Sequence, residues 1–239
     1  ARPEDCDTRE LPPEKAVQAA IAEGCRSIAY TYTEPTIFYE YMLDTAKLAR
    51  QAGLKNVVVS CGYINPEPLR ELVPLIDVYK VDLKGFTEQF YRTICGGSLA
   101  PVLSTLQELS RSQCLVDIVT LVVPTLNDDR DTLKNMFHWI KDHVGINVSL
   151  FLSRFHPTYQ LRNLPPTPID LLVQLREEAM AIGLSYVYLG NVTGHKGENT
   201  YCPSCHQMVI GRVGYSVTSL HLKDGACGHC GTRIPGVWK

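Results

Sequence analysis

Residues 78–85, Val-Tyr-Lys-Val-Asp-Leu-Lys-Gly, decide the fold: a short apolar run ends in charged residues and a glycine. Val and Tyr are typical of buried strands, and a polar, glycine-containing end marks a turn. Amphipathic segments lie on both sides of this run, at about 66–72 and 99–111. The segment therefore predicts one strand of a sheet whose strands are separated by helices.

The same unit recurs from the N-terminus to about residue 192. Apolar runs predict six strands, at 27–31, 56–60, 78–83, 115–123, 147–152 and 186–189. Helical patterns occupy about 13–23, 37–51, 66–72, 99–111, 131–142 and 168–182. We expect Asp128 to cap the fifth helix, and Thr167 or Pro168 to open the sixth.

This regular alternation predicts right-handed crossovers and a parallel sheet, either closed as a barrel or open and doubly wound. No Gly-x-Gly-x-x-Gly follows the early strands, so a dinucleotide-binding fold loses support. A whole or partial α/β barrel is favoured. Because loops at the strand ends converge on one face of either fold, we expect the functional residues there.

The composition is that of an ordinary soluble globular protein, with 45% apolar residues, 20% charged residues and a net charge of −2 over 239 residues. The near balance of 23 basic and 25 acidic residues gives no sign of binding to nucleic acid or an anionic membrane. The sequence has neither a long apolar span nor a signal-peptide core, so we expect a cytoplasmic protein.

The nine cysteines are unevenly spaced: Cys6, Cys25, Cys61, Cys95 and Cys114 are scattered, and four others cluster near the C-terminus. That cluster forms two Cys-x-x-Cys pairs, Cys202/Cys205 and Cys227/Cys230, joined by a segment that alternates like a β-hairpin. Such pairs place four thiolates around one ion, which is typical of a structural zinc ribbon; a rubredoxin-like iron or an extra iron–sulfur cluster is the alternative. We expect a barrel over 1–196 and a zinc-ribbon-like module over 197–239.

The strand ends carry Thr-Glu-Pro (33–35), Cys-Gly-Tyr (61–63), Asp-Leu-Lys-Gly (82–85), Val-Pro-Thr-Leu-Asn-Asp (123–128) and Arg-Phe-His-Pro (154–157). In this order and spacing they resemble the radical SAM enzymes, and most closely the branch of pyruvate formate-lyase activating enzymes and the AmmeMemoRadiSam system. The resemblance covers nearly the whole chain, including the tail that ends Ile-Pro-Gly-Val-Trp. It implies a partial (β/α)6 barrel that holds S-adenosylmethionine against a [4Fe–4S] cluster.

The resemblance also assigns roles to residues. Glu34 and the backbone around it would receive the methionine ammonium, and Lys84 would pair with the methionine carboxylate. Val123 and Pro124 would pack on adenine, while His156 and Arg154 would lie near cofactor or substrate. The implied cofactor-binding residues are Thr33, Glu34, Pro35, Ser60, Cys61, Gly62, Asp82, Lys84, Val123, Pro124 and His156. The implied catalytic residues are His156, Lys84 and Arg154. Weaker candidates for the same site are Tyr32, Tyr159 and Asn191.

The chemistry implied is one-electron reduction of the cluster, cleavage of S-adenosylmethionine to methionine and a 5′-deoxyadenosyl radical, and hydrogen abstraction from a protein glycine or a small molecule. An electron donor such as flavodoxin or ferredoxin is implied as a partner. The Cys-x-x-x-Cys-x-x-Cys motif that binds the cluster is absent from the 239 residues. We expect that motif to lie upstream in the natural protein, and we expect the chain as given to be inactive without it.

Two other hypotheses stay open. The chain could be a non-catalytic zinc-ribbon adaptor on an α/β scaffold, which would bind zinc but not S-adenosylmethionine. It could also be a non-radical barrel enzyme that uses Lys84 or His156 as an acid–base group.

Overall fold

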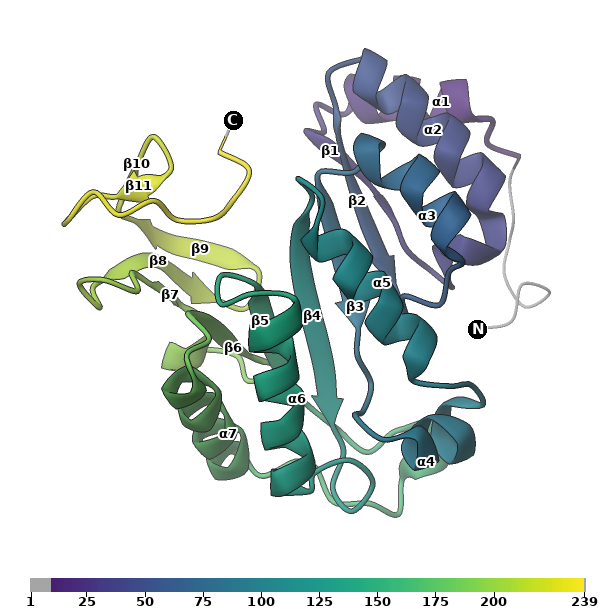
Figure 1. The fold of residues 1–239 in the computed structure, drawn as a ribbon. Coiled ribbons are helices and arrows are strands. Elements are labelled where there is room, and N and C mark those ends of the chain that lie inside the picture. The colour runs from purple at the N-terminus through teal and green to yellow at the C-terminus, as the bar shows by residue number, and fades with distance from the viewer. Residues whose placement is uncertain (1–9, 239) are drawn as a thin grey trace.

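The computed structural model describes residues 10–238, and its main feature is a six-stranded parallel sheet (Figure 1). Sequence neighbours are also neighbours in the sheet, in the order β1 to β6. The strands are β1 (Ser27–Tyr30), β2 (Lys55–Ser60), β3 (Val78–Asp82), β4 (Leu115–Val122), β5 (Ser149–Arg154) and β6 (Tyr186–Gly190). All six predicted strands are present, and the predicted parallel α/β architecture is confirmed. The sheet is open, with β1 and β6 as its edges.

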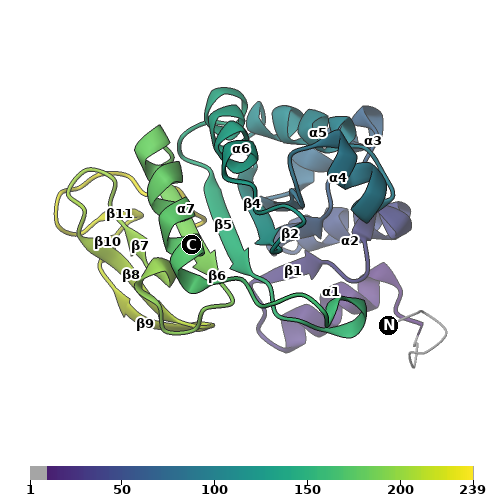
Figure 2. The ribbon, with the colours of Figure 1, turned by 90° about the horizontal axis from the view of Figure 1, so that it is seen from below.

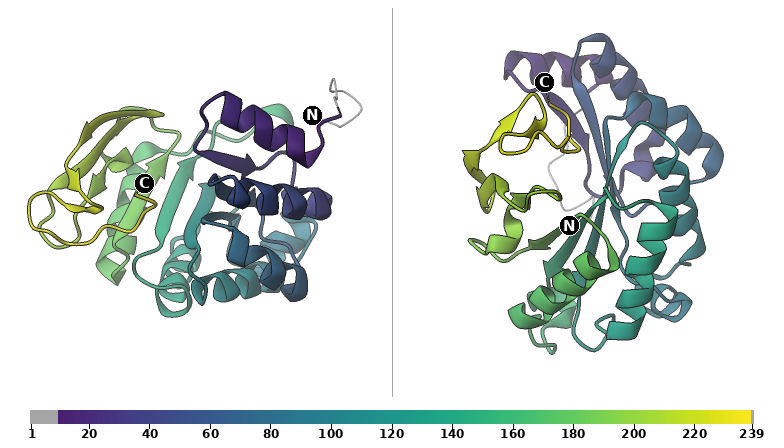
Figure 3. Two further views of the ribbon diagram at one scale, coloured as in Figure 1. Left: turned by 90° about the horizontal axis from the view of Figure 1, so that it is seen from above. Right: turned by 60° about the vertical axis from the view of Figure 1, so that its left-hand side comes forward.

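Helices cover one face of this sheet (Figures 2 and 3). They are α1 (Pro13–Ala22), α2 (Tyr39–Gln51), α3 (Pro66–Leu72), α5 (Ala100–Ser110), α6 (Arg130–His143) and α7 (Ile169–Ile182). Alternate side chains of the strands, such as Tyr79, Ile118 and Leu150, are fully buried against them. The resulting core holds the sheet in place, because apolar area removed from water contributes about 25 cal/mol per Å².

The other face of the sheet is only partly covered. Lys80, Asp117, Phe151 and Tyr188 alternate with the core residues and are half-buried. Successive strand residues point to opposite faces, so these four side chains share the face opposite the helices. Charged residues in the middle of a parallel sheet are unusual, since such sheets are normally apolar on both faces.

Two predicted helix starts are wrong by one residue. Asp129, not Asp128, caps α6: its carboxylate accepts a hydrogen bond from the backbone N–H of Thr132 at 2.9 Å. Asp128 instead accepts from the N–H of Thr125 at 2.8 Å and closes the preceding turn. At α7, Pro168 stands one position before the first helical residue and its neighbour Thr167 does not cap the helix. The Thr167 hydroxyl donates to the carbonyl of Val122 at 2.6 Å, tying this loop to the end of β4.

Several short helices were not predicted. A single turn, α4 (Glu88–Phe90), runs directly into a π-helical turn, η4 (Tyr91–Cys95). Short 3-10 turns lie at η2 (Pro35–Phe38), η3 (Val73–Leu75), η5 (Tyr159–Leu161) and η6 (Lys196–Glu198). Among the described residues, no helix combines the length and the apolar character needed to cross a membrane.

The C-terminal residues form small antiparallel sheets on the β6 side of the molecule (Figure 3). β7 (Thr200–Tyr201), β8 (Met208–Val213) and β9 (Ser216–Leu220) make one, and β10 (Leu222–Lys223) and β11 (Ala226–Cys227) make the other. The β8–β9 pair is the hairpin predicted between the two cysteine pairs. A separate apolar cluster joins this module to Tyr186 of β6, through Cys202, Val209, Ile210, Cys227 and Ile234. The domain boundary between residues 196 and 197 falls inside η6 and stays a prediction.

Candidate functional site

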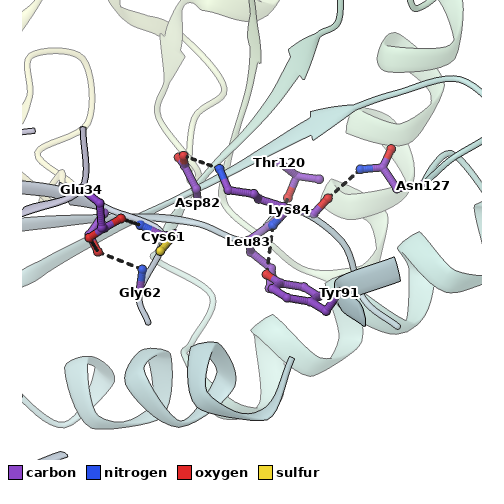
Figure 4. Close-up of polar contacts among 10 residues, drawn as sticks. Glu34, Cys61, Gly62, Asp82, Leu83, Lys84, Tyr91, Thr120 and Asn127 are labelled. Carbon is purple, nitrogen blue, oxygen red and sulfur yellow. Dashed lines mark hydrogen bonds and ion pairs between the residues drawn. The ribbon is translucent and has the colours of Figure 1, made fainter. Parts of the chain in front are cut away.

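A cavity of about 440 Å³ opens at the carboxyl ends of β1, β2 and β3. Four predicted site residues line it, one after β1, one after β2 and two at the end of β3: Glu34, Cys61, Asp82 and Lys84. The turns α4 and η4 close its far side with Tyr91 and Cys95. Figure 4 shows these side chains converging from three strands. Parallel strands place their carboxyl ends at one edge, which is why residues so far apart in sequence meet here.

The Glu34 carboxylate joins the end of β1 to the end of β2. Its Oε1 atom accepts hydrogen bonds from the Ser60 hydroxyl at 2.6 Å and the Thr36 hydroxyl at 3.0 Å. Its Oε2 atom accepts from the backbone N–H of Cys61 at 2.8 Å. The side chain of Cys61 also interacts with this carboxylate, so a ligand at Glu34 would share the carboxylate with Cys61.

The protonation states of Glu34 and Cys61 are set by this contact. Burial alone raises the pKa of Glu34, but the donated hydrogen bonds from Cys61, Ser60 and Thr36 outweigh it and hold the pKa below its usual value. Burial raises the pKa of the Cys61 thiol to about 11, and the neighbouring Glu34 carboxylate adds to this. At neutral pH the cavity therefore contains an ionised carboxylate beside a neutral thiol.

Gly62 is required by the geometry after β2. It has a φ of +71°, and a Cβ atom there would lie 2.9 Å from Cγ1 of Val81 on the next strand. The Gly62 N–H donates to the Ser60 hydroxyl at 2.9 Å, and its carbonyl accepts from Thr105 at 2.8 Å. The glycine thus lets the chain turn tightly enough to place the Cys61 N–H against Glu34.

Lys84 and Asp82 form an ion pair at the same mouth, with 3.0 Å between Nζ and Oδ2. Both side chains are partly exposed, with relative accessibilities of 46% and 35%, so this pair contributes little to stability. The Lys84 backbone is fixed more firmly: its N–H donates to the Tyr91 hydroxyl at 3.2 Å. A mobile ammonium on an anchored backbone can exchange Asp82 for the carboxylate of a ligand.

Asn127 is a positioning residue that the sequence did not reveal. Its side-chain amide donates to the carbonyls of Lys84 at 2.7 Å and Leu121 at 2.8 Å, and its oxygen accepts from the N–H of Val123 at 2.6 Å. Asn127 is 8% exposed, so these three bonds are shielded from water. They tie the end of β3, and with it Lys84, to the end of β4. The residue stood inside a quoted motif, but only the fold shows which backbone groups it contacts.

The other predicted cofactor residues lie around this cavity or further along the rim. Ser60 and Gly62 support Glu34, Thr33 is exposed, and Pro35 is buried beneath the first loop. Val123 and Pro124 are both buried, and they do not line the 440 Å³ cavity. The Val123 N–H already donates to Asn127, so the adenine of the cofactor would meet only side-chain surface or carbonyl groups at this residue.

His156 and Arg154 belong to the ends of β5 and β6 rather than to the cavity. The exposed His156 ring contacts the carbonyl of Asn191 through Nε2 at 3.4 Å. Asn191 donates to the carbonyl of Arg154 at 3.0 Å, and Arg154 Nε donates to the carbonyl of Thr167 at 2.9 Å. The three side chains therefore link neighbouring loops, and none of them lines the 440 Å³ cavity that contains Glu34 and Lys84.

The cavity fits the amino-acid end of S-adenosylmethionine. Glu34 offers a carboxylate for an ammonium group, and Lys84 offers an ammonium for a carboxylate, from two walls of one cavity. The described residues do not supply a [4Fe–4S] cluster site. Only one group of three or more metal-ligating side chains lies close together in residues 10–238, and it is the C-terminal cysteine cluster.

In that cluster the four sulfur atoms of Cys202, Cys205, Cys227 and Cys230 lie within 4.8 Å of one another. The Cys202–Cys230 and Cys205–Cys227 sulfur distances are 3.5 and 3.7 Å. Zn–S bonds of about 2.3 Å in a tetrahedron put the sulfur atoms about 3.8 Å apart, so the four thiols fit one metal ion.

The two cysteine pairs have the same backbone geometry. The N–H groups of His206 and Gly231 donate to the carbonyls of Cys202 and Cys227 at 2.9 and 2.8 Å. Both donors take a positive φ, +59° for His206 and +78° for Gly231. Gly231 takes this conformation without strain, and His206 adopts it despite its side chain.

The profile of the Radical SAM superfamily matches residues 3–140, which is more than half of the chain. The chain belongs to the Radical SAM superfamily, and the predicted resemblance is confirmed. Membership makes the protein an enzyme of this superfamily and implies S-adenosylmethionine and a [4Fe–4S] cluster.

Among particular relatives, the uncharacterized protein MJ0808 of Methanocaldococcus jannaschii is 42% identical over 97% of this chain and 69% of its own length. The benzylsuccinate synthase activating enzyme of Thauera aromatica is 24% identical over 67% of the chain. The chain spans about half, 53%, of that second relative. A domain of a pyruvate-formate lyase-activating enzyme from Bacteroides vulgatus shares the fold, with a TM-score of 0.62, 16% identity, and coverage of 69% of this chain and 99% of that one.

Proposed function

We propose that the protein is a radical SAM enzyme of the activating-enzyme kind, in which the cavity at the carboxyl ends of β1 to β3 holds S-adenosylmethionine. The observation that carries the proposal is that Glu34 and Lys84, one acid and one base, both line the same cavity. When bound and reduced through the cluster, the cofactor would supply a 5′-deoxyadenosyl radical that takes hydrogen from a substrate. A one-electron donor such as flavodoxin or ferredoxin would be required.

The residues of this chain would orient the cofactor. Glu34, kept ionised by its hydrogen bonds, would accept from the ammonium group, and Lys84 would leave Asp82 for the carboxylate. Tyr91 and Asn127 would hold the Lys84 backbone in place, so the backbone would lose little conformational entropy when the cofactor binds. Asp82 would remain at the cavity mouth after Lys84 moves, and its negative charge would limit the positive charge there.

We propose a glycine of a partner protein as the hydrogen donor. Two large apolar side chains that line the cavity are exposed, Ile37 at 78% and Tyr63 at 46% relative accessibility, and Tyr32 and Ile94, close to lining residues in the sequence, are exposed as well. Exposed apolar groups favour contact with a protein surface. The benzylsuccinate synthase activating enzyme, by its name, acts on another enzyme, and the similarity to it supports a protein substrate.

The test is anaerobic turnover of the protein expressed from its full natural reading frame, with S-adenosylmethionine and a chemical reductant. We expect 5′-deoxyadenosine and methionine in equal amounts. Failure to form either product with a fully loaded cluster would contradict the proposal. A partner protein that gains a glycyl-radical signal in the same reaction would identify the substrate.

We also propose that the four C-terminal cysteines hold a structural zinc ion. Four protein thiolates leave no open coordination position for catalysis. The buried Cys202 and Cys227 belong to the apolar cluster that contains Tyr186 of β6, so the ion would fix the module against the sheet. Metal analysis that finds iron in place of zinc would overturn this assignment.

A further inference from the structure

A second, larger cavity of about 750 Å³ lies at the opposite end of the sheet, between the amino ends of β3 to β6 and the C-terminal module. The strands contribute Asp117, Ser149, Phe151 and Tyr188, and the module contributes Thr200 and Arg212. This volume is typical of small-molecule sites, which range from about 300 to 1,000 Å³. In Figure 3 the module lies beside the sheet on the side away from the helices.

This cavity is separate from the candidate cofactor site. Val78 at the start of β3 lines this cavity and Asp82 at the end of β3 lines the cofactor cavity, and four residues of strand separate them by about 13 Å at about 3.3 Å per residue. A reacting atom must approach to about 3–3.5 Å. A ligand confined to this cavity would therefore lie beyond the reach of chemistry at the strand carboxyl ends.

Arg212 is the charged group that faces the cavity from the module. One of its terminal nitrogens, Nη1, donates to the Thr200 hydroxyl at 2.8 Å and to the Glu198 carbonyl at 3.1 Å. Nε and the other terminal nitrogen donate to no group within residues 10–238, and no carboxylate there lies within 4 Å of the guanidinium. The guanidinium carbon is 5.8 Å from the centre of the Tyr188 ring, which holds the side chain in position.

Two acids line the same cavity, Asp117 and Glu198, but among the described residues neither forms an ion pair with Arg212 within 4 Å. The Glu198 carboxylate instead accepts hydrogen bonds from the backbone N–H groups of Gly194 at 2.7 Å and Gly214 at 3.4 Å. Burial raises the pKa of Asp117, with Ser149 and Lys80 acting in the opposite direction. The guanidinium of Arg212 therefore stays available to an anionic ligand.

Much of the wall is apolar. Phe151 and Tyr188 are stacked with their centres 4.9 Å apart, and Ile210, Ile234 and Trp238 add apolar surface from the module and its tail. Such walls favour burial of a hydrocarbon or aromatic body. A polar anion alone would leave this surface in contact with water.

We propose that this cavity binds a small amphipathic carboxylate, with the carboxylate on the free nitrogens of Arg212 and the apolar body between Tyr188 and Trp238. Planar, two-point pairing with a carboxylate is what a guanidinium provides and an ammonium does not. Binding here requires neither S-adenosylmethionine nor the cluster, so it succeeds or fails independently of the proposed function.

Trp238 supplies a local probe, because the chain has only two tryptophans and the other is Trp139 on α6. Trp139→Phe would leave Trp238 as the single fluorophore at the cavity wall. The zinc-loaded Trp139→Phe chain is titrated with 3-phenylpropanoate and with 2-phenylethylamine, which share one apolar frame and differ in the charged group. We expect saturable change in emission with the carboxylate and at least tenfold weaker response to the amine.

Substitutions decide whether Arg212 is responsible. Arg212→Gln is expected to weaken 3-phenylpropanoate binding at least tenfold, whereas Arg92→Gln, at an exposed arginine of η4, is expected to leave it unchanged. If Arg212→Gln loses zinc or its folded circular dichroism, Ser149→Phe replaces it, because this change fills the cavity and keeps Arg212. Equal binding of both probes, no binding of the carboxylate, or binding unaffected by either change would overturn the proposal.

Discussion

At the scale of single residues, Glu34 has two roles, of which the sequence indicated only one. It was predicted as a ligand for an ammonium group, and the structure shows that it also accepts hydrogen bonds from Ser60, Thr36 and the Cys61 N–H. A carboxylate has about four lone-pair positions, so both tasks fit one side chain. Glu34 is thus part of the cavity wall before any ligand arrives.

Replacing Glu34 with glutamine should therefore reduce stability as well as binding. The amide loses one acceptor oxygen and leaves a buried donor unpaired, which costs about 1–3 kcal/mol. Because the folded-state pKa of Glu34 is below its ordinary value of 4.5, its stabilising effect is present above that pH and is lost as the pH falls further. Urea unfolding of wild type and Glu34→Gln from pH 7 to pH 3 measures this.

The difference in unfolding free energy should be full at pH 7 and shrink below pH 4.5. Glu40→Gln, an exposed glutamate on α2, is the matched control and should behave like wild type. A difference that is constant with pH would show that Glu34 does not act through its charge.

Lys84 carries the second prediction at this scale. Lys84→Ala removes the one cation that the described part of the chain places in the lining of the 440 Å³ cavity, and it should weaken S-adenosylmethionine binding at least tenfold in calorimetry. Lys15→Ala, at an exposed lysine of α1, controls for the loss of one positive charge. Equal affinities for the two variants would remove Lys84 from the cofactor site.

At the scale of elements, the strands could be predicted because local composition and long-range packing agree. Each run rich in Val, Ile and Tyr lies between amphipathic segments, and all six become strands of the sheet. The helix starts were less certain because Asp128 and Asp129 are both good caps, and the Thr125 turn decides which is used. The α4–η4 turns were missed because they are too short to show a period.

The candidate site could likewise be predicted only in part from the sequence. Glu34, Cys61, Asp82 and Lys84 were predicted because they are charged or reactive groups directly after strands, and the parallel sheet brings their loops together. Asn127 and Tyr91 were not predicted, because they act on the Lys84 backbone. A contact between a side chain and a distant peptide group leaves no pattern in one sequence.

Asn127 provides the prediction for this scale. Asn127→Ala leaves the Val123 N–H and the carbonyls of Lys84 and Leu121 without their buried partner, so we expect a loss of at least about 2 kcal/mol in unfolding free energy. S-Adenosylmethionine affinity should fall as well, since the Lys84 backbone loses an anchor. Urea unfolding and calorimetry measure both effects, and Asn163→Ala, at an exposed loop position, is the control variant. Unchanged stability would show that water replaces the amide.

At the scale of the whole molecule, the candidate cofactor cavity and the Arg212 cavity lie toward opposite ends of the sheet, and the C-terminal module closes the second. Tyr186 and Tyr188 of β6 face the module, which is held together by a small apolar cluster and four cysteines. Such a small core is rarely sufficient without a metal or another cross-link. The module should therefore depend on its ion.

Cys230→Ser should abolish stable zinc binding. Metal analysis after dialysis is expected to fall from one zinc per chain to a trace, and Trp238 emission should shift to longer wavelength as the module loosens. Cys25→Ser, at an exposed free cysteine outside the cluster, should change neither. Zinc retained at full content in Cys230→Ser would exclude a four-cysteine site.

The central claim is that the cavity at the carboxyl ends of β1 to β3 presents S-adenosylmethionine to an iron–sulfur cluster. The most direct measurement is electron paramagnetic resonance of the reduced protein, expressed anaerobically from its full natural reading frame, with metal and sulfide analysis of the same sample. The account predicts a [4Fe–4S] signal that shifts when S-adenosylmethionine is added and a smaller shift in Lys84→Ala, alongside one zinc. Zinc alone, with no cluster after reconstitution and no cofactor binding, would contradict it and favour a non-catalytic adaptor.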